Sequence, residues 1–258
     1  MLAVAAVGGM ALLARRLRFD EPTAVDREVR WYARRRLPAG IARALGPLFP
    51  LGLPGGYITI AYFTARALRR RGYSGGPAVI TSAVAGWLAH RGAKLVYSRV
   101  RPRDRGRRER TDSYPSGHTT GVTALAVTTA YVLRRQRVAS AAQTAAIAIG
   151  VPALMGAYRV IADDHWTTDV FGGWLLGGAV GLACNAVLAD SLLPPERRPG
   201  RRVRSCPTGA APSGQSVPSC PSPFSSDRHR YHAATELCGL HLAPIFFSFF
   251  GVGRVRMR

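Results

Sequence analysis

Long apolar stretches alternate with short arginine-rich stretches along the chain as far as residue 193. A helix that crosses a bilayer needs about 20 largely apolar residues. Six stretches approach this length, namely residues 2–14, 47–68, 76–98, 117–133, 139–158 and 169–193. The last of them is rich in Gly and Ala, which allow helices to approach one another closely. The pattern therefore predicts an all-α integral membrane bundle of about six helices.

The first apolar stretch, residues 2–14, is short and ends at Arg15 and Arg16. It has two interpretations, a membrane span or anchor and a secretory signal peptide. No basic region precedes the apolar run, and no clear small-residue cleavage site follows it. These features favour a span or anchor.

Residues 20–45 mix Arg and acidic side chains with Val, Trp, Tyr, Leu and Ile. This mixture predicts an amphipathic helix in the membrane interface, broken near Pro38. The loops then alternate between two sides of the membrane. Residues 69–75 and 134–138 lie on one side, whereas the other side holds residues 15–46, 99–116 and 159–168. Both sides are rich in Arg, so the distribution of positive charge does not decide the orientation.

The composition changes at Pro194 to Pro, Ser, Arg and Cys, which is typical of a disordered tail. We therefore expect a membrane-embedded domain over residues 1–193 and a low-complexity basic tail over residues 194–258. The tail contains a short apolar run at 242–253, which is below spanning length.

Composition excludes several classes of protein. Charged residues make up only 19% of the chain, yet Lys and Arg number 36 against 14 Asp and Glu, a formal charge of +22. An average soluble domain has roughly 25% charged residues with both signs interspersed. The four cysteines have no paired spacing, which argues against a disulfide scaffold or a Cys-type zinc site.

Three short motifs carry candidate chemistry, and the first is Lys94-Leu-Val-Tyr-Ser-Arg-Val-Arg101-Pro102. On a helix, the seven-residue separation of Lys94 and Arg101 is two turns, about 10 Å, on one face. Two cations at the mouth of an apolar span are costly unless they have partners. The alternative is a pair of interfacial cations that extend toward water.

The second motif is Tyr114-Pro115-Ser116-Gly117-His118, followed by an apolar run. Ser116 fits a helix N-cap, and Gly117 allows a ligand to approach the backbone closely. The free amides and the dipole at a helix N-terminus suit an anion, on which His118 in the first turn is placed to act. The alternative is an ordinary capped helix start with an interfacial histidine.

The third motif contains Arg159, His165 and Asp169. His165 and Asp169 are four residues apart and share one face if both are helical. A carboxylate that accepts from one imidazole nitrogen leaves the other nitrogen available as a nucleophile. Arg159 lies just upstream as another phosphate partner. We expect Asp163 and Asp164, between them, to be solvated loop charges.

Taken in this order, Lys-x6-Arg-Pro, Pro-Ser-Gly-His and Arg-x5-His-x3-Asp resemble the signature of the type-2 phosphatidic acid phosphatase superfamily. That superfamily also includes bacterial acid phosphatases and vanadium haloperoxidases. The resemblance covers roughly residues 45–190. One position departs from it, because Tyr158 stands where the family usually has Ser before the Arg.

The resemblance implies a core of six helices and a phosphohistidine mechanism. By this resemblance, His165 attacks phosphorus and Asp169 orients the imidazole of His165. His118 protonates the leaving oxygen and then helps to activate water. The implied phosphate-binding residues are Lys94, Arg101, Ser116, Gly117 and Arg159. Independently, phosphoryl transfer needs dense positive charge on the equatorial oxygens and in-line placement of the nucleophile. No Asp and Glu cluster suited to Mg²⁺ is evident, so neither a metal nor another cofactor is expected.

The leading hypothesis is a metal-independent phosphatase in the cell membrane that hydrolyses a lipid phosphate or diphosphate monoester. The lipid tail stays in the bilayer, while the aromatic and basic segment 27–36 covers the headgroup. By analogy with such lipid phosphatases, we place the active site on the extracytoplasmic side. No nucleic-acid partner is expected, and the sequence does not indicate an oligomeric state.

Three alternatives remain open at this point. The first is a vanadate-dependent haloperoxidase-like enzyme, which the membrane spans argue against. The second is a metal-dependent hydrolase with His118, His165 and Asp169 as ligands. The third is a non-catalytic membrane protein that binds anionic lipid or nucleic acid through the arginine run at 99–110.

Overall fold

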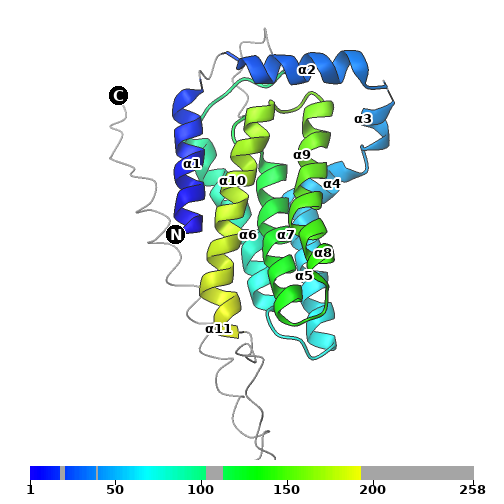
Figure 1. Cartoon of the computed structure of the whole chain (residues 1–258), viewed down its shortest axis with the longest axis vertical. Coiled ribbons are helices and arrows are strands. Elements are labelled where there is room, and N and C mark those ends of the chain that lie inside the picture. The colour runs from blue at the N-terminus through cyan, green and yellow to red at the C-terminus, as the bar shows by residue number, and fades with distance from the viewer. Residues whose placement is uncertain (18–20, 39, 103–112, 193–258) are drawn as a thin grey trace, which may run out of the picture. The chain divides into compact units, whose positions relative to one another are not determined.

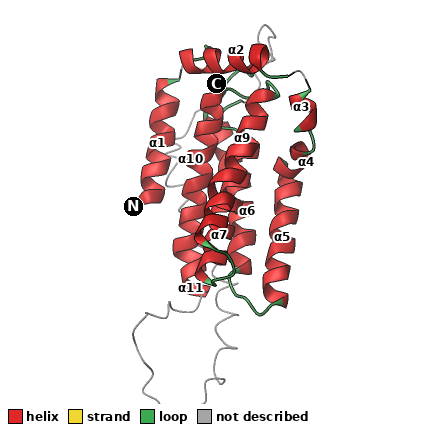
Figure 2. Cartoon of the chain, turned by 45° about the vertical axis from the view of Figure 1, so that its right-hand side comes forward, coloured by secondary structure: helices red, strands yellow, loops and turns green. Residues whose placement is uncertain are grey.

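The computed structural model describes residues 1–17, 21–38, 40–102 and 113–192, and all regular structure in these ranges is helical (Figures 1 and 2). They belong to one compact unit, Met1–Pro199. The predicted all-α class is thus confirmed. The predicted tail and most of the arginine run at 99–110 lie outside the described residues.

Each predicted apolar stretch is largely helical, although the stretch 47–68 is divided at Leu53 into two helices and the stretch 76–98 is helical only to Val96. The helices are α1 (Leu2–Arg16), α2 (Ala24–Arg36), α3 (Ile41–Ala44), α4 (Leu48–Gly52), α5 (Pro54–Arg70), α6 (Gly76–Val96), α7 (Gly117–Arg135), α8 (Ala141–Ala145), α9 (Val151–Ile161), α10 (Thr167–Cys184) and α11 (Asp190–Leu192). Two π-helical segments, Ala146–Gly150 and Asn185–Ala189, join α8 to α9 and α10 to α11. Among the described residues, two continuous helices are long and apolar enough to cross a membrane, Ala141–Ile161 and Thr167–Leu192.

Helix α7 lies at the centre of the bundle, where it packs against α6, α9 and α10 (Figure 1). Helix α1 runs along α10, and α5 packs against α6. Helix α2 lies across the end of the bundle, above the start of α10 and the end of α9 (Figures 1 and 2). The amphipathic segment predicted over residues 20–45 is therefore a helix, and it covers the end of the bundle at which the three motifs lie.

Close packing of α7 and α10 depends on three glycines one turn apart on α10. A Cβ at Gly173 would lie 2.9 Å from the Ser116 carbonyl oxygen, and one at Gly181 would lie 3.1 Å from the Ala124 carbonyl oxygen. A Cβ at Gly177 would overlap the carbonyl oxygen of Thr120. The two backbones thus approach each other directly, as small residues allow in membrane helices.

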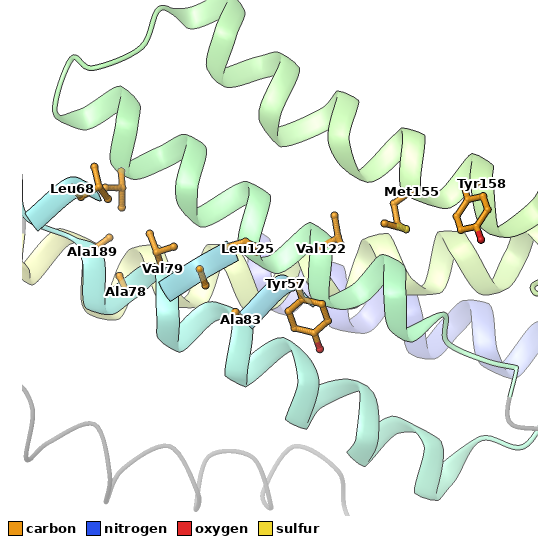
Figure 3. Close-up of a cluster of buried hydrophobic side chains, with 12 residues drawn as sticks. Tyr57, Leu68, Ala78, Val79, Ala83, Val122, Leu125, Met155, Tyr158 and Ala189 are labelled. Atoms are coloured by element: carbon orange, nitrogen blue, oxygen red, sulfur yellow. The ribbon is translucent and has the colours of Figure 1, made fainter. Parts of the chain in front are cut away.

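An apolar cluster fills the space between α5, α6, α7 and α9 (Figure 3). It includes Tyr57 from α5, Val79 from α6, Leu125 from α7, and Met155 and Tyr158 from α9. Tyr158 is 6% exposed. The residue that departs from the family pattern therefore belongs to the hydrophobic core.

The outward faces of the helices are also apolar. Exposed large side chains include Phe63 on α5, Leu88 on α6, Leu154 on α9 and Phe171 on α10. Helices that are apolar on both their inner and outer faces are typical of a bundle surrounded by lipid.

Substitution of Gly177 by Ala tests the backbone contact between α7 and α10. The added methyl group meets the Thr120 carbonyl oxygen, so we expect a loss of about 1–3 kcal/mol, as for an overpacked core. The matched control is Gly178→Ala, whose Cβ has no neighbour within 4 Å. Thermal unfolding of the purified protein in detergent compares the two. Equal unfolding temperatures in the two variants would contradict the proposed contact.

Candidate active site

Four segments meet beneath α2 at one end of the bundle: residues 97–102, residues 113–118, the end of α9, and the start of α10. The amide of Ser116 donates to the Asp169 carbonyl oxygen at 3.0 Å, which joins the second motif to the third. The amide of Ser113 donates to the Arg99 carbonyl oxygen at 2.9 Å, which joins the second motif to the first. The backbone itself therefore brings the three motifs together.

His165 and Asp169 form a buried pair. Nδ1 of His165 lies 3.6 Å from Oδ2 of Asp169, and the two side chains are 2% and 0% exposed. His165 precedes α10, which begins at Thr167, so the two residues do not share a helical face as the spacing predicted. They meet because Asp169, in the first turn, points back toward the helix N-terminus and also accepts from the Trp166 amide at 2.9 Å.

The Asp169 carboxylate has two further donors that the motifs did not predict. Nη1 of Arg99 donates to Oδ1 at 2.7 Å, and the hydroxyl of Ser113 donates to Oδ2. Arg99 is 2% exposed and Ser113 is fully buried. The carboxylate is therefore fixed on both oxygens before it meets His165.

Arg101 and Arg159 approach the other side of His165. Nη1 of Arg101 lies 3.4 Å from Nε2 of His165 and donates to the Asp164 carbonyl oxygen at 3.1 Å. The Arg159 guanidinium pairs with the Asp164 carboxylate at 3.0 Å. The backbone carbonyl oxygen of Arg159 accepts from the His165 amide at 3.2 Å. The Arg101 guanidinium thus lies at the nitrogen of His165 that faces away from Asp169, and Arg159 acts electrostatically on the ring.

His118 lies in the first turn of α7, close to the same two arginines. Arg101, Arg159 and His165 all act electrostatically on its ring. The ring packs on Phe49 with centroids 5.1 Å apart and is hydrogen-bonded to the Phe49 backbone. Within the described part of the chain, its buried Nε2 atom has no hydrogen-bond partner. A buried polar atom without a partner costs about 1–3 kcal/mol, which indicates a position kept for a ligand.

The remaining predicted residues lie at the edge of this group. Lys94 is in the last turn of α6, one turn after His90, on which it acts electrostatically. A Cβ at Gly117 would lie 2.5 Å from Nε2 of His90, so glycine is required there. Ser116 is the N-cap of α7, as predicted, but its hydroxyl accepts from Thr119 instead of from a backbone amide.

Two further predictions about this site are wrong. Lys94 and Arg101 do not lie on one helix, because α6 ends at Val96 and Tyr97 is extended. The extended segment carries Arg101 across to His165. Asp163 and Asp164 are not free loop charges. Asp164 is 5% exposed and pairs with Arg159, whereas Asp163, with a side chain that is 25% exposed, forms a two-pronged ion pair with Arg30 of α2 at 2.6 and 2.7 Å.

Sequence reasoning missed Arg99, Ser113, His90 and Asp26. Asp26 lies in a capping box with Thr23 at the start of α2, which is a visible signal for a helix start but not for a site. Arg99 stands among other arginines, and Ser113 precedes the motif that drew attention. Nothing in the linear pattern distinguishes these residues from their neighbours.

Burial determines the charge of His165. Removal from water, opposed by the hydrogen bond to Asp169, lowers the pKa of His165 to about 4 from its ordinary value of 6.5. The ring is therefore neutral at neutral pH, which is the form that has a nucleophilic lone pair.

Among the described residues, no group of three His, Cys, Asp or Glu side chains is arranged to hold a metal ion.

Comparisons with known proteins found a family model and a solved structure that are similar to this chain. The model of the PAP2 superfamily matches residues 74–192, which contain all three motifs. A crystal structure described as the first transmembrane PAP2 type phosphatidylglycerolphosphate phosphatase, from Bacillus subtilis, matches with a TM-score of 0.60 and 19% sequence identity. The match covers 71% of this chain and 94% of that one, and it shows that the folds are alike. No curated protein sequence matches this chain.

Replacement of Arg99 by Met tests the buried ion pairs at the site. The variant leaves two buried carboxylates without their shared cation, so we expect a loss of about 3–5 kcal/mol in unfolding free energy. The control is Arg30→Met, which breaks the ion pair with Asp163, whose two side chains are each 25% exposed. A partly exposed pair is worth about 1 kcal/mol or less. Unfolding temperatures in detergent measure both, and an Arg99 variant as stable as the Arg30 variant would refute the expectation.

Proposed function

We propose that this chain, whose residues 74–192 match the model of the PAP2 superfamily, is a membrane phosphatase of that superfamily that hydrolyses a lipid phosphate or diphosphate monoester. The reaction proceeds without a metal, through a phosphohistidine at His165. The family match supports phosphatase activity. The site geometry supports the mechanism, and the apolar surroundings of the site support a lipid substrate.

The observation that carries the proposal is the contact between Nε2 of His165 and Arg101, which are 3.4 Å apart. A guanidinium has only donors, so this contact favours a lone pair on Nε2 and the proton on Nδ1, toward Asp169. When a phosphoryl group binds, Arg101 donates to its oxygens instead, which leaves the lone pair of Nε2 to attack phosphorus in line.

Positive charge for the phosphoryl oxygens comes from three chain segments. Arg101 and Arg159 are beside His165, and Lys94 extends the positive charge from α6. The first amides of α7, at Gly117, lack intrahelical partners and suit an anion. Together these groups neutralise the charge on the equatorial oxygens, which is the main requirement of phosphoryl transfer.

His118 is the proposed acid and base. Nε2 of His118, which has no partner among the described residues, takes the acidic proton of the phosphate monoanion when the substrate binds. As Nε2 of His165 forms its bond to phosphorus, the ester P–O bond breaks and His118 gives that proton to the leaving oxygen. In the second step a water oxygen bonds to phosphorus, the N–P bond breaks, and His118 takes the proton of the water. The products are a lipid alcohol and phosphate, or a lipid monophosphate and phosphate from a diphosphate.

The position of the site supports a substrate with an apolar tail. His165 and His118 lie at helix ends, where the headgroup of a lipid meets the bilayer surface. Exposed apolar side chains on α5, α6 and α10 provide a surface for the tail. A water-soluble phosphate ester would gain nothing from such a surface.

Two histidine variants test the proposed roles with different substrates. His165→Ala abolishes phosphate release from phosphatidic acid and from p-nitrophenyl phosphate, because both need the nucleophile. His118→Ala loses far more activity on phosphatidic acid, because p-nitrophenolate leaves without a proton. Activity of the unaltered protein persists in excess chelator. Residual full activity in His165→Ala, or chelator inhibition, would refute the mechanism.

Cysteine labelling tests the proposed extracytoplasmic position of the site. Trp31 on α2 is 52% exposed, and Tyr73, in the turn between α5 and α6, is 36% exposed at the opposite end of the bundle (Figure 1). In a background without Cys184, Cys206, Cys220 and Cys238, an impermeant maleimide labels Trp31→Cys on intact cells. It labels Tyr73→Cys only after permeabilisation. The reverse result would place the site in the cytoplasm.

A further inference from the structure

We infer that Asp26, on the helix that covers the bundle end, is a positioning residue for phosphoryl transfer, which acts on Asp169 through Arg99. The inference rests on the proposed phosphatase reaction and extends it to a helix outside the residues that match the family model, 74–192. Asp26 and Arg99 do not contact the phosphoryl group. They set the charge and orientation of the carboxylate that orients His165.

Arg99 connects two carboxylates from different parts of the chain. Its Nη1 donates to Asp169 Oδ1 at 2.7 Å, and its Nη2 donates to Asp26 Oδ2 at 2.8 Å. Nη1 also donates to the hydroxyl of Thr168 at 2.7 Å. A single guanidinium thus holds α2 against the start of α10 and, in the same geometry, holds the carboxylate that faces His165.

Asp26 also binds the start of α10 directly. Its Oδ1 accepts from the Thr168 amide at 2.9 Å, and its carboxylate accepts from the Thr168 hydroxyl at 2.9 and 3.0 Å. Oδ2 accepts from the Thr23 amide at 3.1 Å. Both carboxylate oxygens are therefore used, and Asp26 itself is 1% exposed.

Stability alone does not explain this cluster. A buried ion pair repays the cost of desolvation poorly, and apolar residues of similar volume often give equal or better stability. Here three charged side chains, Asp26, Arg99 and Asp169, are each 2% exposed or less. A costly arrangement beside a candidate nucleophile indicates a role in the reaction.

The charges of the cluster explain what that role is. Asp26 and Asp169 each carry one negative charge and Arg99 one positive charge, so the cluster has a net charge of minus one. This negative charge stabilises the positive charge that develops on His165 when Nε2 bonds to phosphorus. Without Asp26, the charge of Arg99 is matched by Asp169 alone, and the cluster is neutral toward His165.

A second contact on the same face of α2 provides a matched control. Arg30 lies one turn after Asp26 and pairs with Asp163, which precedes the proposed nucleophile His165 by two residues. This pair also holds α2 in place, but it does so through Asp163 and not through Asp169. Asp163 has a φ of 60°, a conformation that asparagine tolerates well, so Asp163→Asn removes the charge with little strain.

The experiment compares kcat and KM for phosphatidic acid in the full-length protein in detergent. Asp26→Asn keeps the shape of the side chain. We expect it to lower kcat by about ten- to a hundredfold, because such losses are typical when a residue that orients a functional group is replaced. KM changes little, because Asp26 does not touch the phosphoryl group. Asp163→Asn, which weakens the same helix contact, leaves kcat within about twofold of the unaltered protein.

Failure of the inference differs from failure of the proposed function. If Asp26→Asn retains kcat while His165→Ala is inactive, the result supports the phosphatase assignment and contradicts the inferred role of Asp26. If the unaltered protein releases no phosphate from any lipid phosphate, the proposed function is refuted, and the inference about Asp26 that rests on it is refuted as well. A fall in kcat equal in Asp26→Asn and Asp163→Asn would also overturn the inference, since it would reflect only the docking of α2.

Discussion

The site depends on the way in which one buried carboxylate, that of Asp169, is held. It accepts from Arg99, from the Ser113 hydroxyl and from the Trp166 amide, and it lies 3.6 Å from Nδ1 of His165. These donors come from the segment after α6, the segment before α7 and the start of α10. A charge buried to this extent is tolerated only with such partners, so the same bonds that satisfy the carboxylate also assemble the site.

Backbone packing makes that assembly possible. Gly173, Gly177 and Gly181 bring α10 against the backbone of α7, which places the N-termini of the two helices side by side. His118 and Asp169 each lie within the first turn of one of these helices. A larger side chain on this face would separate the two helix starts, and with them the proposed acid and the orienting carboxylate.

The spacing of apolar stretches was sufficient to predict the all-α bundle, because each stretch of lipid-compatible length became helix. The predicted motif residues His118, His165 and Asp169 come together at one end of the bundle, as their order and their positions at helix starts indicated. Helix ends were harder to predict. Nothing in the composition near Val96 indicates that α6 ends there, so Arg101 was placed on the wrong element. Arg99, Asp26 and Ser113 depend on contacts between segments distant in the sequence, which a linear pattern does not encode.

The central claim is that His165 carries the phosphoryl group during turnover. Rapid quenching at alkaline pH during hydrolysis of a ³²P-labelled lipid phosphate, followed by peptide mapping, tests it directly. The account predicts a base-stable and acid-labile label on the peptide that contains His165. Label on a serine or an aspartate, or turnover with no labelled protein at any quenching time, would contradict it.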